Sequence, residues 1–233
     1  LDIAIERVRA LGRGAMETRV VRVLERAAVG GGTGASALLE LAEAFGEGRP
    51  RVARGACRIG RRTVPGDARF SVCIAQIELM SGHDLEAAAY YAEAIERAPT
   101  ERGLYDEAVV RIAGMLERGI EGTDRDELRA LAATAERIIA ERNERFPGTP
   151  SDLPQERLEL LFGVIAETSG DPDEAARRFE ASVRARPTPG ALIAWGVLLE
   201  RLDRGPEALR KYREALDLVA EAGVEARAQR AEI

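Results

Sequence analysis

The chain offers few residues whose side chains could catalyse a reaction. His83 is the only histidine in 233 residues, and it lies between Gly82 and Asp84, where the sequence predicts a turn. A general base or a metal ligand needs organised partners, and one histidine cannot by itself form a Ser/His/Asp or a Cys/His arrangement. We therefore expect His83 to be an exposed turn residue. We also expect the chain to be no enzyme and to contain no catalytic residue, no metal site and no cofactor.

The two cysteines, Cys57 and Cys73, fit neither a zinc site nor a redox motif, because they form no CxxC pair and lie near no histidine cluster. Both lie on the apolar faces of neighbouring predicted helices. We predict that they are small core residues rather than a disulfide. Their Cα atoms should lie within about 12 Å of each other, since the axes of packed helices are about 8 to 10 Å apart. The reducing cytoplasm is then the expected compartment.

Two further segments resemble ligand sites only superficially. The glycine-rich run from Gly30 to Gly34 lacks the Gly-Lys-Ser/Thr ending of a phosphate-binding loop, so it predicts a helix connector. A cluster of acidic residues lacks the alternation and the central glycine of a calcium loop. It predicts the N-terminus of a helix, where negative side chains interact favourably with the helix dipole. This cluster consists of Glu121, Asp124, Asp126 and Glu127.

Arginines form the first candidate binding surface. Six arginines and no acidic residue lie between Glu47 and Asp67. Along a helix, most of them would form one stripe that could bind phosphates or an acidic protein. A run of charge is more often a solvated helix face, and Lys211 is the only lysine of the chain, an arginine bias that we attribute to GC-rich bacterial coding. The candidate basic patch consists of Arg51, Arg54, Arg58, Arg61 and Arg62.

The elements that position these residues are predicted to be helices. Apolar residues make up 45% of the chain, charged residues 32% and aromatic residues only 4%, a composition typical of stacked helices. The segments Met80–Thr100 and Thr168–Thr188 align with each other at an offset of 88 residues. The segments before them carry apolar residues with the i, i+3, i+4, i+7 spacing of a helix. These residues are Phe70, Cys73, Ile74 and Ile77 in one segment, and Leu158, Leu161, Phe162 and Ile165 in the other.

Two further hairpins follow the same pattern. One lies 34 residues upstream of the first, with Ala53, Cys57, Gly60 and Pro65 on and after its second helix. The other has Leu192, Trp195, Gly196 and Leu199 on its first helix and Ala208, Tyr212 and Ala215 on its second. We expect Trp195 to be substantially buried against Tyr212 and Ala208. We expect the turn between the two helices to vary by one residue among the copies.

In the second helices, a small residue, an aromatic residue, a second small residue and a proline recur at a spacing that resembles the tetratricopeptide repeat. The resemblance covers about residues 35 to 101 and 156 to 222. It implies an all-α fold, a right-handed α-solenoid of antiparallel helical hairpins. The expected organisation is N-terminal helices over 1–34, two hairpins over 35–101, a degenerate longer hairpin over 102–150, two hairpins over 151–222 and a helical tail over 223–233.

The degenerate hairpin is predicted from two apolar stripes, which give helices over Leu104–Gly119 and Asp126–Arg145. Thr123 and Asp126 would form a capping box at the start of the second helix. At the front of the chain, helices are predicted over Ile3–Leu11 and Ala15–Ala28. These two helices should cap the stack or cover its groove.

In this family the first helices of the hairpins line a concave groove that binds peptides, so the resemblance implies a scaffold that binds another protein. An apolar groove suits an amphipathic helix or a hydrophobic peptide. The other occupants left open are residues 1–28 of the chain itself and a second copy of the chain. The predicted groove residues are Val72, Gln76, Leu79, Leu160, Val164, Ile193 and Val197.

Two other functions are left open. Nucleic acid or another acidic ligand could bind the basic patch, or the chain could be the non-catalytic portion of a larger enzyme or signalling protein. No stretch approaches the ~18 apolar residues of a membrane span, and no signal segment opens the chain. Because the chain begins at Leu1 rather than methionine, we expect it to be part of a longer protein. A periplasmic location is the alternative if an upstream signal has been removed.

Overall fold

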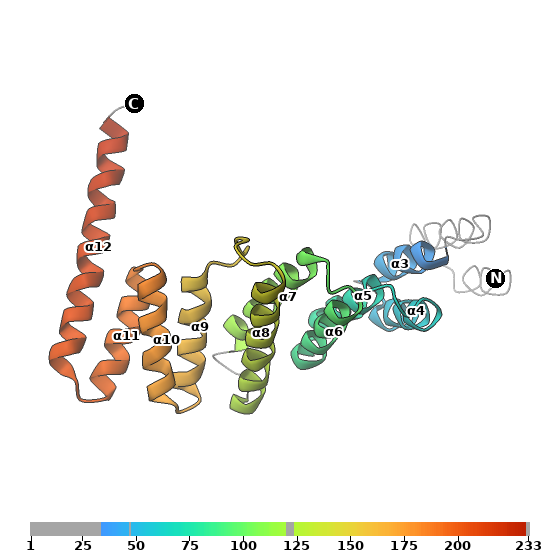
Figure 1. The fold of residues 1–233 in the computed structure, drawn as a ribbon, viewed down its shortest axis with the longest axis horizontal. Coiled ribbons are helices and arrows are strands. Elements are labelled where there is room, and N and C mark those ends of the chain that lie inside the picture. Colours follow the sequence, from blue (N-terminus) through green and yellow to red (C-terminus); the bar gives the residue numbers. More distant parts are fainter. Residues whose placement is uncertain (1–33, 47, 120–123, 232–233) are drawn as a thin grey trace. The chain divides into compact units, whose positions relative to one another are not determined.

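The computed structural model describes residues 34–46, 48–119 and 124–231, with side-chain surroundings up to residue 222 (Figure 1). The regular secondary structure of this part of the chain is helical throughout. The helices are α3 (Gly34–Phe45), α4 (Pro50–Thr63), α5 (Arg69–Met80), α6 (Asp84–Arg97), α7 (Arg102–Gly119), α8 (Arg125–Arg145), α9 (Gln155–Thr168), α10 (Pro172–Ala185), α11 (Pro189–Arg201) and α12 (Gly205–Ala231). The helices predicted over Ile3–Leu11 and Ala15–Ala28, the connector from Gly30 to Thr33 and the proposed cap Thr123 lie outside the described residues.

The chain divides into two compact units, and each is described by itself. The first unit runs up to Ala108 and also includes Glu144–Phe146. The second unit holds Val109–Asn143 and the chain from Pro147 onward. The all-α fold of stacked antiparallel hairpins, predicted from the repeats, is confirmed within both units.

The first unit contains two stacked hairpins, α3 with α4 and α5 with α6, and α4 also packs on α5. Aromatic and aliphatic residues of the first helices, among them Phe45, Phe70 and Ile74, form its core with small residues of α4. At the contact between α4 and α5, Cys57 and Cys73 form a disulfide, with 6.2 Å between their Cα atoms. The predicted neighbourhood of the two cysteines is confirmed.

The prediction that the two cysteines stay unbonded is wrong. Helix packing alone brings cysteines close without bonding them, but this pair lies within the narrow range of about 4.4 to 6.8 Å between Cα atoms that a disulfide needs. Sequence spacing could not show this, because it does not tell how closely two helices approach.

The second unit contains α8 and two hairpins, α9 with α10 and α11 with α12. The apolar stripe predicted for α8 is buried at Leu128, Leu131, Ala135 and Ile138. Three members of the predicted acidic cluster, Asp124, Asp126 and Glu127, lie at the start of this helix, and Glu121 lies outside the described residues. The Asp124 carboxylate accepts a hydrogen bond from the Asp126 backbone N–H at 2.8 Å. In the next part of the unit, Ala175, Phe179 and Leu198 form a core cluster that joins α10 to α11.

The turns inside three hairpins have the same geometry. Gly82, Gly170 and Asp203 follow the first helix of their hairpins and all have a positive φ, of 75°, 81° and 57°. In each turn, the next backbone N–H donates to a carbonyl five residues earlier, as from Asp171 to Ala166 at 2.9 Å. The predicted one-residue variation of the turn is confirmed, because four residues separate α3 from α4 and three separate the helices in each of these hairpins. Asp203 occupies a backbone conformation that glycine adopts more easily.

Close helix packing sets the register of the last two hairpins. A side chain at Gly163 would overlap the Phe179 ring, and one at Gly196 would overlap the Tyr212 ring. Each glycine thus lets an aromatic ring of the second helix reach the backbone of the first. Trp195 is only half-buried, and it packs on the cluster of Ala175, Phe179 and Leu198. The predicted substantial burial of Trp195 is therefore an overestimate, because Tyr212 takes the place over Gly196.

Candidate functional site

In the first unit, the first helices α3, α5 and α7 line a cavity of about 780 Å³. Two of the predicted groove residues, Val72 and Gln76, lie on its wall. Val72 is half-buried, Gln76 is exposed, and Leu79 is half-buried but does not line the cavity. The other apolar residues of the wall are Leu39, Ala42, Ile77, Met80 and Leu104. Met80 is 57% exposed, so a large thioether side chain is available at the edge of the cavity.

The polar groups of this cavity pair largely with one another. The Gln76 amide donates to Glu107 Oε1 at 3.3 Å, which holds α5 and α7 together across the cavity. Arg69, which also lines the cavity, pairs with Asp67 at 2.6 Å. The hydrogen bond from Arg69 lowers the pKa of the Asp67 carboxyl, so this pair stays ionised at neutral pH. Glu43, which also lines the cavity, is exposed and has no ion-pair partner among the described residues. A ligand of this cavity would therefore meet an apolar wall whose other charged groups are already paired.

In the second unit, the predicted groove residues differ in exposure according to their hairpin. Leu160 and Val164 of α9 are half-buried, and both pack on the cluster that contains Leu198 of α11. Ile193 and Val197 of α11 are 48% and 41% exposed. Within this unit α11 packs against α9 and α10, and this explains why the side chains of α9 are less accessible. Leu160 and Val164 therefore contribute to hairpin packing, and Ile193 and Val197 are the accessible pair.

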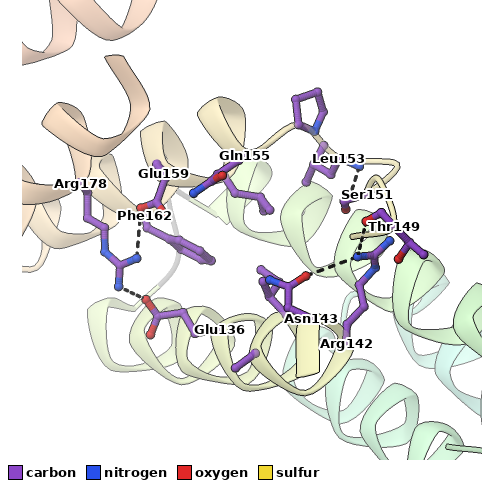
Figure 2. A pocket seen from close by; sticks show the side chains of 14 residues that line it. Glu136, Arg142, Asn143, Thr149, Ser151, Leu153, Gln155, Glu159, Phe162 and Arg178 are labelled. Atoms are coloured by element: carbon purple, nitrogen blue, oxygen red, sulfur yellow. Dashed lines mark hydrogen bonds and ion pairs between the residues drawn. The ribbon is translucent and has the colours of Figure 1, made fainter. Parts of the chain in front are cut away.

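A cavity of about 470 Å³, which the sequence analysis missed, lies between α8, the segment after it and α9 (Figure 2). Its apolar wall includes Ile139, Leu158 and Phe162, and the amides of Asn143 and Gln155 lie along its polar side. No sequence motif marks this cavity. It arises because residues 147–154 contain no helix and separate α8 from α9.

Ion pairs and hydrogen bonds compensate the charges at both ends of this cavity. At one end, Arg178 pairs with Glu136 of α8 and with Glu159 of α9, the latter at 3.1 Å (Figure 2). At the other end, the buried Arg142 donates to the Pro150 carbonyl at 2.6 Å and to the Thr149 carbonyl at 3.4 Å. The cavity thus resembles a preformed space for an uncharged group more than a site for an ion.

The sequence pattern of the tetratricopeptide repeat matches residues 38–102 and 160–223, together more than half of the chain. This chain belongs to the tetratricopeptide repeat family. The two matched regions cover most of the four hairpins α3/α4, α5/α6, α9/α10 and α11/α12, although α3 and α9 begin before them and α12 ends beyond them. No curated protein shows significant sequence similarity to the chain.

Solved structures of other tetratricopeptide-like chains have a similar fold. A crystal structure of the MamA protein aligns with a TM-score of 0.55 and 12% sequence identity, over 80% of this chain and 92% of that chain. MamA from Desulfovibrio magneticus RS-1, from residue 41 to its end, aligns with a TM-score of 0.51 and 10% identity, over 82% of this chain and 97% of that chain. At such low identity the likeness concerns the fold alone.

In the first tetratricopeptide hairpin, the predicted basic patch divides into two sets. Arg54 pairs with the buried Glu78 at 2.7 Å, and Arg61 pairs with Glu93 at 2.8 Å. These two arginines therefore join α4 to the next hairpin. The remaining members of the patch, Arg51, Arg58 and Arg62, are exposed. Packing thus leaves a smaller basic surface than the sequence predicts.

The histidine and the acidic residues of the described segments form no metal-binding cluster. His83 is exposed in its turn, as predicted, and its Nδ1 lies 2.9 Å from Glu78 Oε2. Within the described ranges, no three His, Cys, Asp or Glu side chains gather closely enough to hold a metal ion. None of the described helices combines the length and the apolar composition that crossing a bilayer requires.

Proposed function

We propose that this protein is an interaction scaffold that binds an apolar peptide segment or an amphipathic helix of a partner protein in the cavity of its first unit. The observation that carries the proposal is the cavity of about 780 Å³ lined by α3, α5 and α7, whose wall includes Val72 and Gln76. Membership of the tetratricopeptide repeat family supports a scaffold of this kind. Fold alone does not establish a function, so the proposal rests on the cavity.

Apart from the exposed Glu43, the polar side chains of the cavity wall are already paired, and this favours an apolar ligand. Gln76 is bonded to Glu107, and Arg69 is paired with Asp67. Breaking such pairs to bind a charged ligand would cost their existing interactions. Contact with Val72, Leu104 and Met80 instead removes apolar surface from water, and this stabilises a complex. In the second unit, Ile193 and Val197 offer a further exposed apolar pair.

The test compares partner capture by the whole chain and by two variants, with the bound proteins quantified by mass spectrometry. Val72→Glu places a carboxylate on the cavity wall, where an apolar ligand would desolvate it, and Arg69 of the same wall is already paired with Asp67. We expect this variant to lose partners that the unchanged protein retains at high salt. Leu85→Glu is the matched control, because Leu85 is 38% exposed on α6 and does not line the cavity. Helical circular dichroism checks that both variants fold.

Equal capture by the Val72→Glu variant and the unchanged protein would show that the cavity is not the binding surface. Capture that disappears only at high salt would favour the second candidate, an acidic ligand or nucleic acid on the arginines of α4. An internal occupant is tested by deleting residues 1–28. If those residues cover the cavity, the shortened chain should bind more hydrophobic dye and self-associate.

We further infer that the chain is not an enzyme and that it works in an oxidising compartment such as the bacterial periplasm. Its one histidine lies exposed in a turn, and this supports the first inference. The Cys57–Cys73 disulfide supports the second, because disulfides persist mainly outside the reducing cytoplasm. Labelling free thiols in freshly lysed cells tests it. Because Cys57 is fully buried, the cells are lysed into denaturant that contains the labelling reagent. Full labelling of both cysteines would favour the cytoplasm instead.

A further inference from the structure

The outward surface of α4 is a continuous stripe of arginine and aliphatic residues. Val52 and Ile59 are 43% and 53% exposed, and the three arginines beside them are exposed as well. Arg51, Gly55, Arg58 and Arg62 recur at the i, i+4, i+7 and i+11 spacing of one helix face, and Val52 and Ile59 lie next to them, seven residues apart. At its centre, a side chain added to Gly55 would meet no atom within 4 Å, so this face is open. We define the α4 outer face as Arg51, Val52, Gly55, Arg58, Ile59 and Arg62.

Among the described residues, no ion pair compensates the positive charge of this face. The inward arginines of α4, Arg54 and Arg61, already have carboxylate partners in Glu78 and Glu93. Arg51, Arg58 and Arg62 form no ion pair within the described part of the chain. No acidic residue occurs between Glu47 and Asp67 that could neutralise them from the same segment. The outer face therefore combines a local positive field with exposed aliphatic surface.

Nucleic acid would bind the arginines of this face but not its aliphatic side chains. Phosphates would pair with the arginines, but Val52 and Ile59 would gain nothing from a phosphate backbone. The α4 outer face also has no aromatic side chain on which a base could stack. The aliphatic residues thus argue against nucleic acid as the partner.

The shape of the face argues against a helix of another protein. A docking helix usually lies in a groove between two elements, where its apolar face is enclosed. Here the exposed aliphatic side chains all belong to α4 and to Val64, the residue that follows it. They lie on one helix and its end rather than in a groove between two elements, and a bilayer surface needs no groove to cover them.

We propose that the α4 outer face docks on an anionic phospholipid bilayer. Val52 and Ile59 would enter the boundary between head groups and acyl chains, and the arginines beside them would pair with lipid phosphates. The inference is independent of partner binding in the first unit, because the cavity there is lined by α3, α5 and α7. If both hold, the scaffold would present its partner at a membrane surface.

The test measures co-sedimentation of the whole chain with vesicles of phosphatidylcholine and phosphatidylglycerol, and with vesicles of phosphatidylcholine alone. We expect binding to the anionic vesicles and little binding to the neutral ones. Replacing Arg51, Arg58 and Arg62 together with Gln should weaken binding roughly a hundredfold, since each arginine near an anionic surface contributes about 1 kcal/mol. The matched control replaces Arg125, Arg137 and Arg213, three exposed arginines of α8 and α12, and should bind almost normally.

A second variant separates insertion from simple charge attraction. Val52→Ser with Ile59→Ser keeps every charge and should still weaken binding about tenfold, because less apolar surface leaves water. Equal binding to neutral vesicles, full binding by the triple Gln variant, or full binding by the double Ser variant would overturn the proposal. Binding of a single-stranded oligonucleotide without vesicle binding would overturn it in favour of nucleic acid. Unchanged thermal unfolding confirms that each variant is folded.

Discussion

Removing the disulfide between α4 and α5 should destabilise the first unit by an amount that follows from the number of residues between the two cysteines. Cys57 and Cys73 are 16 residues apart in sequence. In the chain-entropy account, a cross-link that closes a loop of about this length contributes roughly 3 kcal/mol, because it restricts the unfolded chain. The perturbation is the double substitution Cys57→Ala with Cys73→Ala, or reduction of the unchanged protein with dithiothreitol.

The assay is urea unfolding, followed by circular dichroism and by tryptophan fluorescence. A loss of about 3 kcal/mol should lower the urea midpoint of the first unit by about 1.5 M if the slope m is about 2 kcal/mol/M. Trp195 is the only tryptophan and belongs to the second unit, so its fluorescence should shift much less than the circular dichroism. Dithiothreitol should have no effect on the double Ala variant, which controls for other actions of the reductant.

A midpoint that stays the same after complete reduction of the unchanged protein would refute this reasoning. It would mean that packing between α4 and α5 holds the first unit together without the bond. Cys57 is fully buried, so the double Ala variant also loses some packing. Reduction alone keeps the sulfur atoms in place, and it is therefore the cleaner measurement.

Three further predictions concern the second unit. Gly196→Ala should destabilise the protein by about 1 to 3 kcal/mol, because the added methyl overlaps the Tyr212 ring. Gly190→Ala, at a position with open space around it, should not destabilise it. Equal thermal midpoints for the two variants would contradict the packing described for α11 and α12. The Lys211 ammonium lies 4.4 Å from the centre of the Trp195 ring, so Lys211→Gln should lower stability by about 0.5 to 1 kcal/mol and change tryptophan emission, and Arg210→Gln should leave the emission alone. Hydrogen bonds from Arg177 and Arg178 lower the pKa of Glu174, so the contribution of this carboxylate to stability is present above the ordinary glutamate pKa and is lost as the pH falls through the lowered value. Glu174→Gln should therefore reduce the fall in thermal midpoint at acid pH. A fall as steep as that of the unchanged protein would count against the pairing.

The repeated pattern of the sequence determined the fold class and most of the helices. Stripes such as Leu128, Leu131, Ala135 and Ile138 have the helical period, and the structure buries them. This works because a helix that must bury one face needs apolar residues at a fixed spacing, whatever lies opposite. The repeat of small and aromatic residues in the second helices also identified the family, since close packing of two helices requires small residues at the contact.

Only the tertiary structure decided which side chains meet. The sequence shows six arginines between Glu47 and Asp67 but not that Arg54 and Arg61 are paired with glutamates of the next hairpin. It shows two cysteines on apolar faces but not a separation of 6.2 Å between their Cα atoms. Helical period fixes the direction of a side chain relative to its own axis. The distance to a neighbouring helix depends on every residue at the contact, so bonds, ion pairs and cavities emerge only when the hairpins are stacked.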